Sequence, residues 1–112
     1  MKLYLSDPCS GYNEQERDDF FGKWEDYFRR KGFDVFNPRK NGLPPSSSWA
    51  EHMRVDIAQL CCCDVLVRLS DYFSMGVKLE LHVAEHLGIK IVDYDQLERC
   101  NGDIDKLKYL FS

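Results

Sequence analysis

The sequence predicts a small doubly wound α/β domain, in which a Rossmann-like or flavodoxin-like parallel sheet, with strand order about 2-1-3-4, carries helices on both faces. Short β-prone runs alternate with helical patterns of roughly 12 to 18 residues, the arrangement of βαβ crossovers. The 112 residues, of which 44% are hydrophobic, suffice for one compact domain with a core and are too few for two. We therefore expect residues 1–112 to form a single domain.

The first strand and the first helix are marked by their boundaries. Lys2–Ser6 is a short β-prone run that an Asp-Pro pair ends. Asn13 and Glu16 resemble an N-cap and its capping partner, and aromatic residues then recur at helical spacing until Gly32. We expect a strand, a loop and a long helix.

A second strand and a long loop follow. Phe33–Phe36 is a β-prone run that an Asn-Pro pair ends, and residues 39–47 hold a glycine, two prolines and the start of a serine run. Loops of that length in small domains often cover a site.

The middle of the chain predicts a second helix and a third strand. Ser48 and Glu51 have the S-x-x-E form of a capping box. The helix is expected to run to about Cys62, and four apolar residues share one of its sides: Trp49, Met53, Ile57 and Leu60. Asp64–Leu69 is expected to form the third strand.

The last part of the chain predicts a third helix, a fourth strand and a terminal helix. Ser74 is expected to cap a helix that runs to about His86 and stops before Gly88. Lys90–Asp93 is the expected fourth strand, and a weak helical pattern around Leu107 predicts a short terminal helix.

Ligands of such a sheet bind beyond the carboxyl ends of its strands, at the point where the winding reverses. With the predicted strand order, the reversal falls between the first and third strands. The loop after Leu5 and the loop after Leu69 should therefore face each other across the binding site.

The composition argues against several classes of partner. The formal net charge is -4, and the Lys and Arg residues are scattered, which disfavours a nucleic acid polymer or an anionic membrane as ligand. No apolar run approaches the roughly 20 residues of a membrane span, and the first residues, MKLYLSDP, turn polar too soon for a signal peptide. We expect a cytoplasmic protein that binds a small molecule.

The five cysteines include the triplet Cys61–Cys63, whose spacing suits neither a disulfide framework nor a zinc knuckle. We expect three small core side chains at a helix end. A metal or redox role is the alternative.

Two acidic residues lie on the apolar sides of their helices. At about 100° per residue, Glu80 falls about 60° from Val77, although the opposite side of the helix has room for a carboxylate. Asp56 falls about 20° from Trp49 on the apolar side of the preceding helix. Carboxylates are rarely buried unless they are paired or hydrogen-bonded, because removing an ionised one from water costs several kcal/mol or more. Two such acids therefore indicate a functional site; the alternative is that each lies at the edge of its helix or binds a buried amide.

Tyr4 lies in the middle of the first predicted strand, between two leucines. Taken alone, Tyr4 is interpreted as an ordinary core residue whose ring is buried and whose hydroxyl needs only some polar partner.

Four stretches of the chain resemble the nucleoside 2-deoxyribosyltransferase superfamily: YLSDPCSG, FNP, MRVDIAQLCCCDVLVRL and SMGVKLELHVAEHLG. The resemblance covers nearly the whole chain up to Asp93. The chain is similar in particular to small phage and bacterial domains of this superfamily that begin YISGPMTG and carry a W-x-x-x-M-x-x-D helix. It is also similar to deoxynucleoside 5'-monophosphate N-glycosidases. The resemblance implies cleavage or transfer at the N-glycosidic bond between a nucleobase and a deoxyribose, without a cofactor.

The resemblance also implies catalytic roles. Glu80 matches the nucleophile that attacks the anomeric carbon, and Asp56 matches the acid that contacts the base and helps to protonate it. Tyr4 matches the tyrosine that holds the nucleophilic carboxylate. A retaining cleavage needs one ionised carboxylate and a second group for the proton of the leaving group, and these residues fit that need.

The same resemblance indicates the substrate site. Ser74 stands where transferases of free nucleosides tend to carry aspartate and where the monophosphate N-glycosidases carry a phosphate-binding serine. A serine at a helix N-terminus suits a phosphate, and Gly76 lets a ligand approach that turn closely. The loop after the first strand is expected to contribute four further substrate-binding residues: Ser6, Asp7, Ser10 and Gly11.

Two departures from the family pattern bear on the substrate. Asp7 stands where the family usually has glycine, and residues 6–12 hold no arginine for a phosphate. A second acid beside a phosphate repels it. The sequence therefore supports a 5'-monophosphate as substrate less strongly than it supports cleavage or transfer at an N-glycosidic bond. Three basic residues outside the loop are candidates to compensate: Arg39, Lys40 and Arg54. Members of the superfamily are often dimers or larger, so the resemblance implies a homodimer or a higher homo-oligomer.

Other functions fit the same sequence less well. The main alternative is a non-catalytic nucleotide-binding module on this fold, acting as a sensor or as a phage antagonist of a host enzyme. A receiver-like signalling domain is disfavoured because the first strand does not end in the acidic pair that such domains use for magnesium. His82 and His86 lack a third ligand at a suitable spacing and, like His52, are expected at the surface, so we expect no metal.

Overall fold

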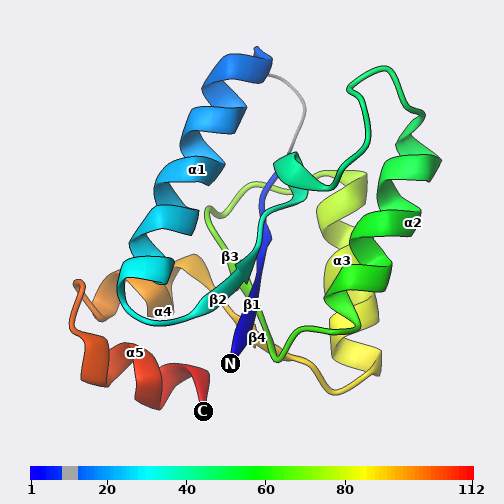
Figure 1. Cartoon of the computed structure of the whole chain (residues 1–112). Coiled ribbons are helices and arrows are strands. Elements are labelled where there is room, and N and C mark those ends of the chain that lie inside the picture. The colour runs from blue at the N-terminus through cyan, green and yellow to red at the C-terminus, as the bar shows by residue number, and fades with distance from the viewer. Residues whose placement is uncertain (9–12) are drawn as a thin grey trace.

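The computed structural model describes residues 1–8 and 13–112, and its strands form a four-stranded sheet in which every pairing is parallel (Figure 1). The strand order is β2-β1-β3-β4, which confirms the predicted order. The strands are β1 (Lys2–Ser6), β2 (Asp34–Phe36), β3 (Val65–Arg68) and β4 (Lys90–Val92). Each end lies within one residue of its predicted position.

Helices cover both faces of the sheet, as predicted. In Figure 1, α1, α4 and α5 lie on one side of the strands, and α2 and α3 lie on the other. The helices are α1 (Glu14–Arg30), the short 3-10 helix η1 (Pro38–Lys40), α2 (Trp49–Leu60), α3 (Met75–His86), α4 (Tyr94–Arg99) and α5 (Ile104–Phe111).

The side chains of β1 alternate between two cores, because successive residues of a strand point to opposite faces. Leu3 and Leu5 pack in the larger core with residues of α1, α4 and α5. Tyr4 points the other way and packs with Leu60 of α2 and Ala84 of α3. The face that carries Tyr4 is therefore the face on which α2 and α3 lie.

Side-chain caps start the three long helices at the predicted residues. The Asn13 side chain accepts a hydrogen bond from the Glu16 N–H at 2.8 Å, and the full capping box of Ser48 and Glu51 is present. The Ser74 Oγ accepts from the Val77 N–H at 3.1 Å. Each cap satisfies a backbone donor that the first helical turn leaves without a partner.

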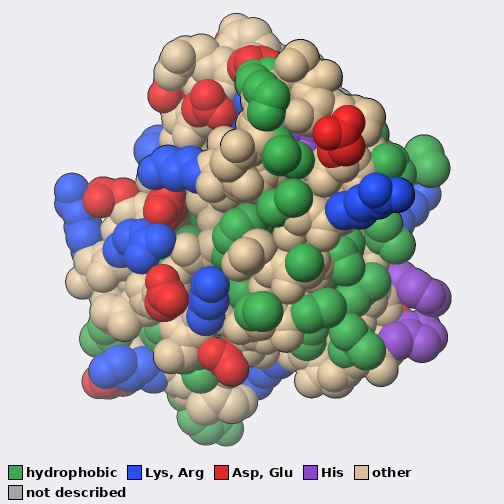
Figure 2. Space-filling model, turned by 45° about the vertical axis from the view of Figure 1, so that its right-hand side comes forward, with side chains coloured by type: hydrophobic (Ala, Val, Ile, Leu, Met, Phe, Trp, Pro, Cys, Tyr) green, Lys and Arg blue, Asp and Glu red, His purple; other side chains and the backbone are tan. Residues whose placement is uncertain are grey.

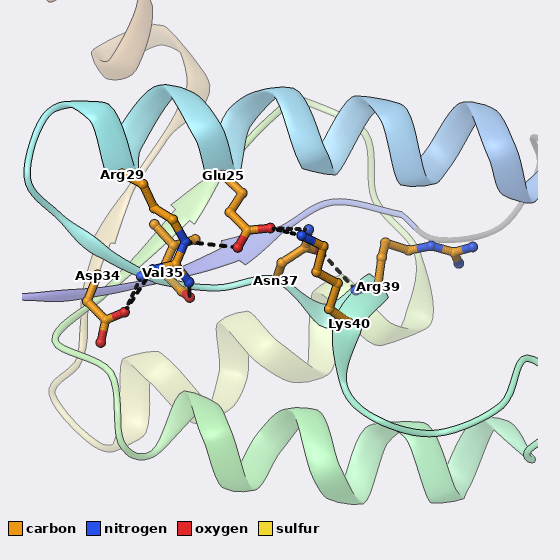
Figure 3. A network of polar contacts seen from close by, with 7 residues as sticks. All are labelled: Glu25, Arg29, Asp34, Val35, Asn37, Arg39 and Lys40. Carbon is orange, nitrogen blue, oxygen red and sulfur yellow. Dashed lines mark hydrogen bonds and ion pairs between the residues drawn. The ribbon is translucent and has the colours of Figure 1, made fainter.

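Polar contacts around Glu25 tie the start of the long loop to α1 (Figure 3). The Glu25 carboxylate accepts from Asn37 Nδ2 at 3.1 Å and from Lys40 Nζ at 2.9 Å, and Arg29 Nε donates to it at 2.9 Å. Burial alone would raise the pKa of Glu25, but the hydrogen bonds from Lys40, Asn37 and Arg29 outweigh it and lower the pKa from 4.5 to about 2. Asn37 also caps η1, since its Oδ1 accepts from the Arg39 N–H.

Trp49, which helical periodicity places on the apolar side of α2, is not part of the core, since the residue is 54% exposed. Trp49 occupies the first turn of α2 and lines a cavity instead of the core. Met53 and Leu60, further along the same stripe, are buried as predicted.

The prediction of three core cysteines is wrong for two of them. Cys61 and Cys62 are exposed, because α2 ends at Leu60 and the chain turns there. Cys63 is buried and its Sγ donates to the Gln59 carbonyl at 3.2 Å; burial raises the pKa of its thiol to about 11.

The helix α4 is absent from the prediction, which continues β4 to Asp93. Asp93 instead precedes α4, and its N–H donates to Gln96 Oε1 at 3.0 Å. A six-residue helix offers too few turns for a periodic pattern, so this capping contact is its main sequence signal.

Among the residues that the structure describes, no helix is both long and apolar enough to cross a membrane.

Candidate active site

A cavity of about 590 Å³ lies between the end of β1, the loop after β2 and the N-terminal turns of α2 and α3. The prediction placed the site between the loops that follow Leu5 and Leu69: Asp7, from the first of these loops, lines the cavity, but from the second only its end at Ser74 does so, and the loop after β2 forms another wall. Five acidic residues line the cavity, Asp7, Glu14, Asp18, Asp56 and Glu80, together with Arg39 and His52. Glu80 and Asp56, which were singled out from helical periodicity, therefore meet in one cavity.

The Glu80 carboxylate accepts hydrogen bonds from two side chains of β1. Its side chain lies on the buried stripe of α3, and the residue is only 5% exposed. The Tyr4 hydroxyl donates to Glu80 Oε2, and the Ser6 hydroxyl donates to Oε1 at 2.9 Å. Tyr4 and Ser6 are two residues apart on one strand, so their side chains point to the same face and reach the same carboxylate.

The pKa of Glu80 is raised from 4.5 to about 7. Burial is the main cause, because it disfavours the charged form, and the negative charges of Asp56 and Asp7 add to it. The hydrogen bonds from Tyr4 and Ser6 act in the opposite direction. A substantial fraction of Glu80 is therefore protonated at neutral pH.

Asp56 lies on the buried side of α2 and is 6% exposed. Asn41 Nδ2 donates to its Oδ1 at 3.0 Å. Burial raises the pKa of Asp56, and the Asn41 hydrogen bond opposes this shift.

Among the cavity residues that are missing from the predicted site, His52 and Asn41 are hydrogen-bonded to each other beside Asp56. His52, which was expected at the surface, is half-buried and lines the cavity, and its Nδ1 lies 3.0 Å from Asn41 Nδ2. The signal for His52 is its position four residues before Asp56, which places both on one helix face. Asn41 belongs to the loop, where no periodic pattern marks it.

Asp7, the residue after β1, also lines the cavity and forms an ion pair with α1. Its Oδ2 lies 2.8 Å from a guanidinium nitrogen of Arg17 in α1, and the Ser70 hydroxyl donates to its Oδ1. Burial raises the pKa of Asp7, and the contacts with Ser70 and Arg17 oppose this shift. The arginine near the first loop thus comes from the following helix, and in this structure it contacts Asp7.

The other predicted substrate-binding residues divide into two groups. Ser74 and Gly76 line the cavity, and a Cβ on Gly76 would lie 3.4 Å from the sulfur of Met53, an ordinary van der Waals distance. Ser10 and Gly11 lie outside the described residues.

The three candidate phosphate partners are placed differently. Arg39 lines the cavity, and its Nε lies 2.8 Å from Asp18 Oδ1. Lys40 pairs with Glu25 on the side of α1, and Arg54 is exposed on α2. Acidic side chains therefore outnumber basic ones around this cavity.

No three His, Cys, Asp or Glu side chains within residues 1–8 and 13–112 are grouped so that they could hold a metal ion. His82 and His86 are both exposed on α3, with ring centroids 4.1 Å apart.

Comparison with known proteins relates the chain to one family and to two solved structures. The family model of a domain of unknown function (DUF4406) matches residues 1–93. A 2-deoxyribosyltransferase from the psychrotolerant bacterium Bacillus psychrosaccharolyticus is similar with a TM-score of 0.65 and 24% identity, over 83% of this chain and 71% of the other. The CMP N-glycosidase BcmB of Clostridium botulinum is similar with a TM-score of 0.58 and 17% identity, over 83% of this chain and 67% of the other.

A search of curated proteins finds no match. At these identities the two solved structures show a shared fold, and it is the fold that the sequence resemblance predicts.

Proposed function

The chain belongs to the DUF4406 family, and we propose that its cavity binds a deoxynucleoside or a deoxynucleoside 5'-monophosphate and cleaves or transfers its N-glycosidic bond. The observation that carries the proposal is the Glu80 carboxylate, buried and held by Tyr4 and Ser6 in the same cavity as Asp56. The named activities of the two similar structures, a 2-deoxyribosyltransferase and a CMP N-glycosidase, support it. A volume of about 590 Å³ lies within the usual range for small-molecule sites.

In the proposed reaction, ionised Glu80 attacks the anomeric carbon of the sugar. The new bond joins that carbon to a Glu80 oxygen, while the carbon–nitrogen bond to the base breaks and the base takes a proton from the Asp56 carboxyl. A water molecule or a second base then attacks the same carbon, gives its proton to Asp56, and releases Glu80. Tyr4 and Ser6 fix the carboxylate through both steps, and neither step requires a cofactor.

The proposal is tested by incubating the protein with each 2'-deoxynucleoside and each 5'-monophosphate and measuring free base by chromatography. Release of base from at least one compound is the expected result. A panel in which no compound is bound and no base appears would contradict the proposal. A panel in which compounds bind but stay intact would favour the non-catalytic module.

Replacing Tyr4 by phenylalanine should shift the pH dependence of base release. In the wild type, kcat/KM should rise through pH about 7 as Glu80 ionises, because only the carboxylate is a nucleophile. The Tyr4 hydroxyl stabilises the ionised form, so its removal should move this rise to higher pH by about one unit or more. A matched substitution of the exposed Tyr109 should leave the profile unchanged. An unshifted profile in Tyr4→Phe would exclude the proposed role of this hydroxyl.

Replacing Ser74 by alanine separates the two substrate classes. If Ser74 binds a phosphate, Ser74→Ala should lower kcat/KM for monophosphates about tenfold or more and leave free nucleosides nearly unchanged. Because Ser74 also caps α3, the variant should lose about 1 kcal/mol of stability in either case. Equal losses for both substrate classes would assign Ser74 to capping alone.

The homodimer implied by the sequence resemblance is also proposed, through the outer surface of α2 and α3. Figure 2 shows hydrophobic side chains gathered on the face that it presents. The exposed large apolar side chains that belong to α2 and α3 are Trp49, Met75 and Leu79. Leu79→Lys should shift the sedimentation coefficient toward that of a monomer, since a charge in an apolar interface is left unpaired. Tyr109→Lys, on the distant α5, is the control. A wild type that sediments as a monomer at all concentrations would overturn this proposal.

A further inference from the structure

Asn41 connects two side chains of the cavity by hydrogen bonds. Its Nδ2 lies 3.0 Å from Asp56 Oδ1 and 3.0 Å from His52 Nδ1. Its Oδ1 accepts from the backbone N–H of Leu43 at 3.1 Å. All the polar atoms of the Asn41 side chain therefore have partners within the protein.

These partners define where the protons lie. A backbone N–H can only donate, so the Asn41 atom that faces Leu43 must be the carbonyl oxygen, and the atom that faces His52 must be the amide nitrogen. An amide nitrogen has two protons and no acceptor capacity, so His52 Nδ1 must accept. In a neutral imidazole with Nδ1 as the acceptor, the proton is on Nε2.

The Nε2–H of His52 is then a donor on a side chain that lines the cavity. His52 precedes Asp56 by about one turn of α2, so both side chains face the cavity from one helix. Asn41 reaches them from the opposite side, from the loop that the Glu25 contacts tie to α1.

We propose that Asn41 is a positioning residue that holds His52 as a hydrogen-bond donor, through Nε2–H, to an acceptor atom of the nucleobase bound beside Asp56. The identity of the ligand rests on the proposed function, and the orientation of His52 does not. Ring nitrogens and carbonyl oxygens at the edge of a nucleobase are neutral acceptors that a neutral N–H donor matches.

The first test measures the imidazole tautomers by long-range proton–nitrogen NMR spectra at pH 9. His52 should show the Nε2–H pattern. His86 is an internal control of opposite sign, because its Nδ1 lies 2.9 Å from the His82 carbonyl oxygen and must donate to it. An Nδ1–H pattern for His52 in the wild type would overturn the proposal.

The variant Asn41→Asp sharpens this test. Aspartate keeps an oxygen for the Leu43 N–H but presents only acceptors to His52, so the imidazole proton should move to Nδ1. The spectrum of His86 should stay unchanged. A His52 pattern that is the same in Asn41→Asp and in the wild type would also overturn the proposal. These spectra need no turnover, so they are independent of whether the protein cleaves a nucleoside.

The second test measures binding of the four 2'-deoxynucleosides by calorimetry in the Glu80→Gln background, where turnover does not interfere. His52→Phe removes the donor and should weaken binding of the best ligand about five- to tenfold. His52→Gln keeps an N–H near the position of Nε2 and should recover most of the loss. His82→Phe, on the exposed side of α3, is the control. Equal dissociation constants for His52→Phe and His82→Phe would overturn the assignment of His52 to the ligand.

Discussion

Replacing Glu80 by glutamine should abolish base release, lowering its rate by at least roughly 10⁴-fold. An amide is a poor nucleophile and cannot form the glycosyl ester on which the proposed reaction depends. Tyr4 and Ser6 can still bond to the glutamine side chain, since one can donate to its oxygen and the other can accept from its nitrogen. The variant should therefore keep the shape of the cavity and lose only the chemistry.

Two controls accompany this variant. Glu85→Gln makes the same change on an exposed position of α3 and should retain full activity. In the wild type, a 2-deoxy-2-fluoro nucleoside should leave a covalent adduct on the peptide that contains Glu80, detected by mass spectrometry. Full activity of Glu80→Gln, or an adduct on another residue, would contradict the assignment of Glu80 as nucleophile. A wild type without an adduct would favour a binding module.

The same variant should be more stable than the wild type at alkaline pH. Because the pKa of Glu80 in the folded protein is about 7 and its ordinary value is 4.5, the folded chain binds this proton more tightly than the unfolded chain does. The wild type therefore loses stability as pH rises from about 4.5 to about 7, by at most about 3 kcal/mol in all. Glu80→Gln lacks this loss, so urea unfolding should show a gain that is complete above pH 7 and absent near pH 4.

Replacing Arg17 by methionine should destabilise the fold by about 3–5 kcal/mol. The Arg17 and Asp7 side chains are only 8% and 2% exposed, so the substitution removes the guanidinium that pairs with a buried carboxylate. A loss of that size is a large share of the roughly 5–15 kcal/mol that stabilises a typical domain. The loss should be greater at pH 8 than near pH 4, because protonation of Asp7 removes the negative charge with which Arg17 pairs.

The control for this prediction lies on the same helix. Arg30 pairs with Asp26 at 2.9 Å, but the two side chains are 78% and 60% exposed, so Arg30→Met should change the unfolding free energy by less than about 1 kcal/mol. The double variant Arg17→Met with Asp7→Asn should be more stable than Arg17→Met alone. Equal unfolding free energies of Arg17→Met and Arg30→Met in urea would show that the buried ion pair does not contribute the proposed stability.

The features that local sequence patterns determine are the ones that were predicted correctly. Asn13, Ser48 and Ser74 start helices because their side chains satisfy donors within the next three residues, which requires no knowledge of the rest of the chain. Glu80 was found in the same way, because helical periodicity alone places it among apolar neighbours. The parallel pairing of the strands follows from the alternation of strands and helices.

Features that depend on contacts between distant segments were not predictable in this way. Asn41 lies in a loop of irregular backbone and forms hydrogen bonds with Asp56 and His52 of α2. Arg17 of α1 forms a hydrogen bond with Asp7, which follows β1. Periodicity also failed for Trp49, because a helix end can extend past the sheet that the rest of the helix covers. Ser10 and Gly11 remain predictions, since they lie outside the described residues.

The contacts of Glu25 have a consequence for the entropy of ligand binding. Because Asn37 and Lys40 are already bonded to α1, the loop segment that leads to Asn41 is ordered before a ligand arrives. Binding then loses little backbone freedom in this segment, and more of the contact energy appears as affinity. In Glu25→Ala this loop segment would become ordered only when the ligand binds. Glu25, which lies outside the cavity, therefore lowers the entropic cost of ligand binding.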